Sequence, residues 1–198
     1  MRTLEEAALD ASTCTKCRLS QGRTQVVYGV GDPNADLMFI GEAPGFHEDK
    51  QGEPFVGAAG QLLNQLLGEI DVPRDDVYIN NVILCRPPGN RDPLPDELEA
   101  CKPWLDERVA LIDPAVVVTL GNWATRYILG KQVSISRVRG QRFPWSGRTV
   151  IPTYHPAAVL HGGGQASNQM TALRADFQEI RRALAERPQP AEEQLGLF

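Results

Sequence analysis

The chain has 198 residues, of which 42% are hydrophobic and 23% charged, and a formal net charge of −5. These are ordinary values for a globular protein with a buried core. No apolar run approaches the length of a membrane span, and the N-terminus carries acids where a signal peptide would be basic. We therefore predict a soluble, cytoplasmic protein.

Strands alternate with helices along most of the chain. A short acidic helix and a cysteine loop precede Arg23. Apolar, β-branched runs predict strands over 25–30, 36–41, 76–84, 115–120 and 148–156, the last of which leads into a loop, and apolar spacing predicts helices over 60–70, 94–112, 122–129 and 169–186. This order predicts an α/β fold in three layers, with a mostly parallel sheet covered on both sides. Residues 1–186 form the single predicted domain, and 187–198 read as a flexible tail.

Three unusual stretches follow predicted strands. They are "GEAPGFHEDKQGEPFVGAAG" at 41–60, "NNVILCRPPGNR" at 80–91 and "YHPAAVLHGGG" at 154–164. Ligands in open α/β sheets bind outside the carboxyl ends of the strands. We therefore expect these stretches to meet in one site at that edge of the sheet.

The charge is distributed unevenly. From Pro114 to Ala175 there are 62 residues with no Asp or Glu and with seven Lys or Arg. Such asymmetry is typical of a polyanion-binding face, and a chance shortage of acids on an ordinary surface is the alternative. We call residues 114–175 the basic segment.

The four cysteines predict a metal centre. Cys14 and Cys17 form C-x2-C in a polar loop, whereas Cys85 and Cys101 are far apart, near a strand end and on a helix. Four thiolates suit tetrahedral zinc or an iron–sulfur cluster, and the spread second pair favours the cluster. Zinc and unconnected buried thiols remain as alternatives.

Five stretches, together with the four cysteines, carry a resemblance to a known family. They are "GEAPG" at 41–45, "EDKQGEPFVGAAGQLL" at 48–63, "NNVILCRPPGNRDPLPDE" at 80–97, "VVVTLG" at 116–121 and "YHPAAVL" at 154–160. In this order they resemble the iron–sulfur uracil-DNA glycosylases, often called family 4, and the resemblance covers the chain to about residue 185. It implies a central, mostly parallel four-stranded sheet, a 4Fe-4S cluster on the four cysteines, and excision of uracil from double- or single-stranded DNA. We expect a monomer.

The resemblance and the chemistry together assign a pocket. A flipped base needs an aromatic face, for which Phe55 is the candidate. An amide that both donates and accepts can read uracil, and the motif favours Asn81 over its neighbour Asn80. His155 is expected to hydrogen-bond the anion that develops on the departing base.

Activation of water is less clearly assigned. Gly41 has no side chain, so the backbone of the "GEAPG" loop can approach uracil and water closely. The third residue of the loop is Ala43, which cannot position water, so Glu42 is the candidate beside it. Without a strong base the reaction would be dissociative. Glu48 is expected near uracil C5, where it would help exclude thymine.

Other residues are expected to hold the DNA. Leu160 or His161 is the candidate wedge that fills the gap left by the flipped base, with a plain surface loop as the alternative. Arginines of the basic segment, Arg137, Arg139 and Arg142, are expected to contact phosphates. The insert by which a related branch traps DNA covalently is absent from the sequence, so we expect turnover.

The chain ends in "QLGLF", which resembles the motif that docks bacterial repair proteins on the sliding clamp. Four residues match it: Gln194, Leu195, Leu197 and Phe198.

Three rival functions remain. They are excision of another damaged base, DNA binding without catalysis, and nucleotide-phosphate chemistry, which lacks its phosphate-loop motif here.

Overall fold

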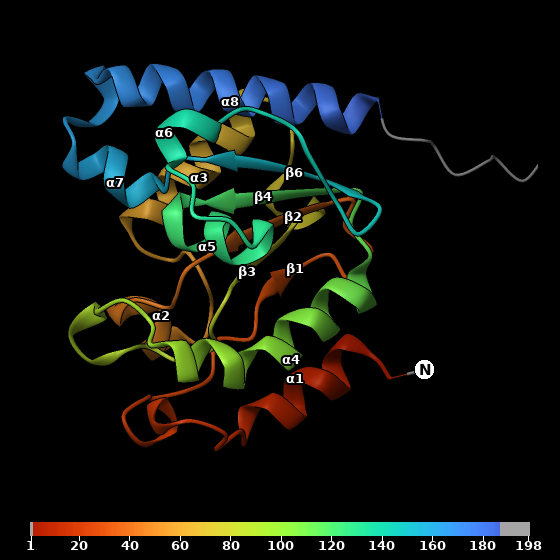
Figure 1. Cartoon of the computed structure of the whole chain (residues 1–198), viewed down its shortest axis with the longest axis vertical. Helices are drawn as coiled ribbons and strands as arrows, with labels where there is room; N and C mark the ends of the chain where they lie inside the picture. Colours follow the sequence, from red (N-terminus) through yellow and green to blue (C-terminus); the bar gives the residue numbers. More distant parts are fainter. Residues whose placement is uncertain (1, 187–198) are drawn as a thin grey trace, which may run out of the picture.

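A six-stranded sheet forms the centre of the computed structural model, which describes residues 2–186 (Figure 1). The strand order is β1-β3-β2-β4-β6-β5. The strands are β1 (Val30–Gly31), β2 (Leu37–Gly41), β3 (Tyr78–Asn81), β4 (Val116–Leu120), β5 (Phe143–Trp145) and β6 (Arg148–Thr153). The clamp-motif prediction on residues 194–198 lies outside the described residues.

The four central strands are parallel, and the two short edge strands are antiparallel to their neighbours. The predicted fold class, three layers around a mostly parallel sheet, is confirmed. The four strands implied by the resemblance are β3, β2, β4 and β6, and β1 and β5 extend the sheet at its edges. All residues of β2, β3 and β4 are buried, as expected for strands covered on both faces.

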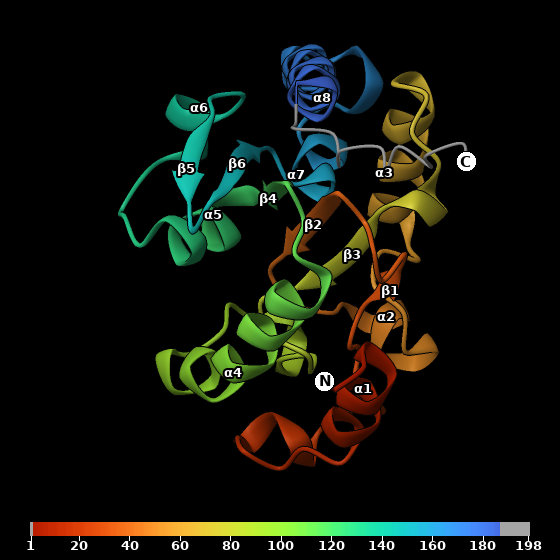
Figure 2. The same ribbon diagram turned by 90° about the vertical axis from the view of Figure 1, so that its right-hand side faces the viewer.

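Helices cover both faces of the sheet (Figure 2). The longer helices are α1 (Leu4–Ser12), α3 (Ala58–Glu69), α4 (Pro95–Ile112), α5 (Gly121–Leu129) and α8 (Asn168–Ala185). The shorter ones are α2 (Phe46–Gln51), α6 (Ile135–Val138), α7 (Pro156–His161) and the 3₁₀ turns η1 (Arg18–Gln21), η2 (Arg74–Asp76), η3 (Pro88–Asn90) and η4 (Gly164–Ala166).

Each face of the sheet has its own hydrophobic cluster, because adjacent residues of a strand point to opposite faces. Ile40 packs in a cluster with Leu105 of α4 and with α1 and α5. Phe39 packs on the other side with α3 and α8, and its ring stacks on Phe177 at 5.9 Å. In both views α1 lies beside α4, so these helices form an outer layer on the Ile40 side.

Sequence patterns predicted the long elements well and the short ones poorly. The helices predicted over 60–70, 94–112, 122–129 and 169–186 are confirmed as α3, α4, α5 and α8. The strand predicted over 25–30 is wrong except at Val30, where β1 begins. The stretch after Tyr154 is not simply a loop, because Pro156 starts helix α7. Among the described residues, no helix is both long and apolar enough to cross a membrane.

Candidate active site

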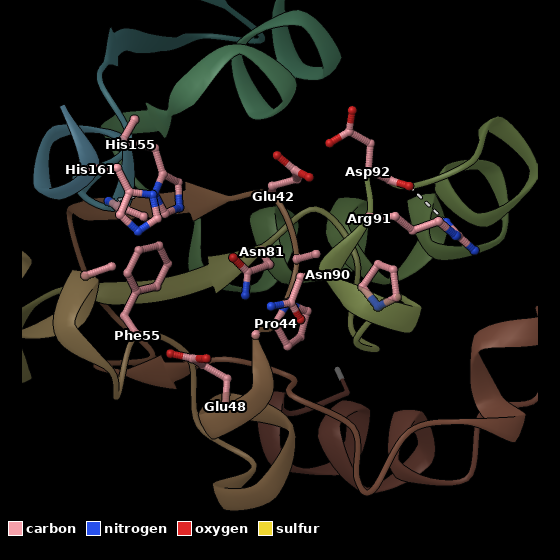
Figure 3. A pocket seen from close by; sticks show the side chains of 16 residues that line it. Glu42, Pro44, Glu48, Phe55, Asn81, Asn90, Arg91, Asp92, His155 and His161 are labelled. Carbon is pink, nitrogen blue, oxygen red and sulfur yellow. Dashed lines mark hydrogen bonds between the residues drawn. The ribbon is translucent and has the colours of Figure 1, made fainter.

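A pocket of about 530 Å³ lies at the carboxyl ends of the parallel strands (Figure 3). Glu42 follows β2, Asn81 ends β3, and His155 lies two residues after β6. Phe55 and Glu48 come from the stretch between β2 and α3. The three stretches predicted to meet at this edge therefore do meet, because parallel strands deliver their following loops to one side.

Phe55 forms one wall of the pocket. Its φ of 56° is positive, which is unusual for a bulky residue. The side chain is buried, and its ring stacks on the imidazole of His155 at 5.6 Å between centroids with an interplanar angle of 26°. A flat apolar face is thus held beside a polar ring, which suits a planar heteroaromatic ligand.

Asn81 lies beside Gly41 in the parallel register of β2 and β3. A Cβ at Gly41 would lie 2.4 Å from Asn81 Oδ1 and 2.9 Å from the Phe55 ring, so only glycine leaves room for this amide. Asn81 lines the pocket. Asn80 points to the other face of the sheet, is fully buried, and its amide has no hydrogen-bond partner in the part of the chain that the structure describes.

His155 is held as a neutral imidazole. It caps α7, and its Nδ1 accepts a hydrogen bond from the backbone N–H of Ala157 at 3.1 Å. The acceptor role of Nδ1 leaves the proton of the neutral ring on Nε2. Desolvation lowers the pKa of His155 to about 4, and the nearby Glu48 carboxylate raises it only partly. His155 therefore offers an N–H donor to the pocket near neutral pH.

Glu42 is one of three carboxyl-bearing residues that line the pocket, with Glu48 and Asp92. Burial, and secondarily the charge of Asp92, raises its pKa to about 7. Ala43 beside it contributes no polar side-chain group, as the sequence indicates. Asp92 also lines the pocket but is exposed. With its pKa raised to about 7, the Glu42 carboxylate can accept a proton from water near neutral pH.

Glu48 supports the pocket wall. Its Oε1 accepts hydrogen bonds from the backbone N–H groups of Val56 and Gly57, both at 3.2 Å. These bonds fix the loop that follows Phe55, which favours a supporting role. The expected position near uracil C5 stays a prediction.

Leu160 and His161, the two wedge candidates, lie at the end of α7 in different surroundings. Leu160 packs against the core cluster that contains Phe39. His161 is exposed and lines the pocket. A residue that enters DNA must be free of the core, so His161 fits this role better than Leu160.

The four cysteines gather in and against the hydrophobic cluster on the Ile40 side. Cys85 and Cys101 are buried, and burial raises the pKa of Cys101 to about 12. N–H donors lie near the sulfurs, with Arg23 Nη1 3.5 Å from Cys85 Sγ and Trp104 Nε1 3.4 Å from Cys14 Sγ. Within residues 2–186, no set of three or more His, Cys, Asp or Glu side chains is arranged to hold a single metal ion.

Most arginines of the basic segment are already paired. Arg139 forms an ion pair with the buried Asp176, which also accepts from Thr153 Oγ1 at 2.6 Å. Arg142 pairs with Glu179 and Glu186. These carboxylates come from α8 and its C-terminal cap, beyond the basic segment. Two further segment arginines pair with carboxylates outside it, Arg148 with Asp113 and Arg174 with Glu69.

Arg137 differs from these arginines. It is exposed, and no ion pair joins its side chain to any residue between 2 and 186. The predicted phosphate contacts thus concern one free guanidinium and two, Arg139 and Arg142, that are paired within the fold.

Several residues that line the pocket have no role predicted from the sequence. They belong to the loop between β3 and α4 and to α7: Pro87, Asn90, Arg91, Asp92, Ala157 and Ala158. Arg91 reaches the buried Glu97 with both Nη atoms, at 2.8 and 2.6 Å, which fixes this loop. The stretch "CRPPGNRDPLPDE" contained the signal, because an Arg six residues before a Glu at a helix start can close such a loop.

Comparison with known proteins gives a consistent result. The family model for the uracil DNA glycosylase superfamily matches residues 28–184. A type-4 uracil-DNA glycosylase of Sulfurisphaera tokodaii is 47% identical over 190 residues, which cover 91% of this chain and 84% of the relative. A type-4 enzyme of Thermotoga maritima is 49% identical over 149 residues, 74% of this chain and 78% of the relative.

A more distant match is a type-5 uracil-DNA glycosylase of Thermus thermophilus. It is 34% identical over 164 residues, which cover 73% of this chain and 74% of that relative.

Proposed function

The chain belongs to the uracil-DNA glycosylase superfamily and excises uracil from DNA, and we propose that Phe55, Asn81 and His155 bind the flipped base in the pocket described above. The observation that carries this assignment is the convergence of the three side chains from three distant loops. A stacking face, an amide and a neutral imidazole donor are the groups that recognition of uracil and departure of its anion require.

In the reaction, the bond between uracil N1 and C1′ breaks, and its electron pair remains on the base. Negative charge then develops on the uracil oxygens. His155 donates from Nε2 to that charge, and this donor is favoured because Nδ1 is already an acceptor. Phe55 stacks on the base, while Asn81 donates to O4 and accepts from N3–H. Cytosine reverses both of these positions and is rejected.

Water completes the reaction at C1′ of the sugar. Its oxygen bonds to the positively charged carbon, and its proton goes to the Glu42 carboxylate. The pKa of Glu42, raised to about 7, makes it a base near neutral pH, but a weak one. We therefore propose a dissociative path, in which the glycosidic bond is largely broken before water adds.

We propose that Cys14, Cys17, Cys85 and Cys101 hold a 4Fe-4S cluster. The donor set fits, because four thiols from three segments lie in or against one hydrophobic cluster, and N–H donors lie near two of the sulfurs. The cluster would join the N-terminal cysteine loop to the loop after β3 and to α4. Iron and acid-labile sulfide in the purified protein would support the cluster. Stoichiometric zinc without iron would contradict it and indicate a zinc site.

Two further proposals concern partners. Arg137 contacts DNA phosphate, and His161 fills the gap left by the flipped base.

The terminal residues Gln194, Leu195, Leu197 and Phe198 dock on a sliding clamp, while residues 1–186 act as one catalytic domain. We further propose that the protein works as a monomer in the cytoplasm. Removal of residues 194–198 should abolish co-elution with the clamp and leave excision on short duplexes unchanged.

The uracil assignment is tested by incubating the purified protein with a duplex that contains one uracil, followed by alkali. Strand breakage is expected for the uracil duplex and not for matched cytosine or thymine duplexes. Asn81→Asp should reduce uracil excision because it removes the amide donor. Unchanged excision by Asn81→Asp would remove Asn81 from the pocket assignment.

A further inference from the structure

Arg108 of α4 is a fully buried cation in an unusual setting. No carboxylate in the described part of the chain pairs with it, although burial of an unpaired charge costs several kcal/mol. Arginine cannot lose its charge to avoid this cost. Such a residue needs an explanation beyond packing.

The guanidinium donates instead to three backbone carbonyls. Nε donates to Trp104 O at 3.1 Å, Nη1 to Tyr28 O at 2.5 Å and Nη2 to Asn81 O at 3.1 Å. The Tyr28 ring also lies 5.2 Å from the guanidinium carbon. The planar fork therefore holds the segment before β1 and the last residue of β3 in a fixed relation.

Asn81 is the residue whose side-chain amide lines the pocket. From α4, Arg108 donates a hydrogen bond to the backbone carbonyl of that same residue. The guanidinium therefore limits how far the Asn81 amide can shift. Displacement of a positioning group by about 1 Å can reduce an enzymatic rate by about 100-fold. A single hydrogen bond at this carbonyl thus has consequences for base recognition.

The same helix reaches the cysteine group. Cys101 lies on α4, and Trp104, one turn before Arg108, places its indole N–H 3.4 Å from Cys14 Sγ. One helix therefore contacts the cysteines and the pocket strand within two turns. A cluster held by four thiolates would be anionic and would offset the buried cation.

We propose that Arg108 is a positioning residue for Asn81, and that through it α4 links the cysteine group to recognition of uracil. This inference rests on the proposed role of Asn81 in the pocket. It goes further, because it predicts that Arg108, which does not reach the ligand, sets the strength of uracil binding.

Arg108→Lys tests the inference, because it keeps the charge and replaces the rigid fork by one ammonium group. We expect kcat/KM for excision to fall about 10- to 100-fold and inhibition by free uracil to weaken. Affinity for a duplex with a stable abasic-site analogue should stay unchanged, since that ligand has no base to read. Arg126→Lys is the matched control, because Arg126 Nε also donates to a backbone carbonyl, that of Val133, away from the pocket.

A double-mutant cycle separates positioning from general damage. In an Asn81→Ala background, Arg108→Lys should lower kcat/KM for excision by less than about twofold, because the amide that Arg108 positions is gone. An equal loss in both backgrounds, or no loss in the wild-type background, overturns the proposal. Inactive wild-type protein would instead defeat the uracil assignment itself.

Arg108→Gln gives a readout independent of activity. It keeps side-chain N–H donors but removes the charge, so the purified variant should contain less iron than Arg108→Lys. Equal iron content in the two variants would overturn the link to the cysteine group. Failure of both variants to fold would assign Arg108 to fold maintenance and overturn positioning.

Discussion

Three polar side chains of the pocket and two arginines of the basic segment are in opposite states. In the pocket, neither the Asn81 amide nor the Glu42 carboxyl has a hydrogen-bond partner within residues 2–186, and His155 keeps one ring nitrogen free. In the basic segment, Arg139 and Arg142 are bound to carboxylates of the same protein. Groups that await a ligand are left unpaired, whereas groups that hold the fold together are already satisfied.

This difference shows what a charge count along the sequence omits. The basic segment contains no acids, but α8 and its cap bring Asp176, Glu179 and Glu186 against it. The excess of positive charge in this stretch is therefore largely neutralised in space. Motifs gave better guidance than charge, because they specify residues at strand ends, where the topology of a parallel sheet determines their neighbours.

The largest expected effect comes from the pocket. His155→Ala should lower kcat by about 100- to 1,000-fold, the usual cost of removing one donor to a developing anion. Affinity for uracil-containing DNA should change little. Single-turnover excision and equilibrium DNA binding measure the two quantities.

His47→Ala is the control for His155→Ala, because His47 is exposed and does not line the pocket. An equal loss of rate in both variants would mean that the effect is not specific to the donor.

In the basic segment the largest effect should be on stability. Arg139→Ala leaves the carboxylate of Asp176, 1% exposed, without its cation. We expect a loss of about 3 kcal/mol in the free energy of unfolding, measured by chemical denaturation. Arg137→Ala is the control and should cost less than about 0.5 kcal/mol. Equal free energies of unfolding for Arg139→Ala and Arg137→Ala would show that the ion pair of Arg139 with Asp176 does not stabilise the fold.

The sequence was sufficient for most of the fold because its long elements have strong periodicity. The run "AVVVTL" contains β4, and the leucines of "GQLLNQLLGEI" form the buried face of α3. The segment "QVVYGV" misled, since of its three valines only Val30 enters β1. Val27 is buried outside any strand, and Val26 packs half-buried against the hydrophobic cluster on the Ile40 side. Tertiary packing decided that segment, and local propensity could not reveal it.

The position of a site residue could be predicted where one motif places it at the end of a strand or in the loop that follows. Phe55, Asn81 and His155 were predicted in this way, and all three line the pocket. Arg108 was not, because nothing in "WLDERVALI" indicates that this Arg, unlike its neighbours, points inward to the carbonyl groups of Tyr28 and Asn81. A pairing between residues 27 and 80 positions apart depends on the whole fold.

The pH dependence of excision tests the role of the Glu42 carboxyl. With a pKa of about 7, Glu42 is mostly protonated at pH 6 and mostly ionised at pH 8, so a base role predicts a rate that rises with a midpoint near 7. His155, with a pKa of about 4, stays neutral over this range.

Glu42→Gln should abolish that rise and lower the rate at pH 8 by about 10-fold, while the rates at pH 5 converge. Asp92→Asn should move the midpoint to lower pH, because it removes a charge that raises the pKa of Glu42. A rise that persists in Glu42→Gln would mean that another group titrates.

The smallest effect should separate Arg137 of the basic segment from Arg142, which is paired with two carboxylates of the fold. Arg137→Ala should weaken DNA binding by about 1 kcal/mol and reduce the slope of log K against log salt by about 0.9, the value for one lost phosphate contact. Arg142→Ala should change the slope less, because Glu179 and Glu186 already neutralise that charge. Equal slopes would mean that Arg142 exchanges its carboxylates for phosphates on binding. In that case the charge pattern of the sequence, rather than the ion pairs of the free protein, would be the better guide to the DNA-binding face.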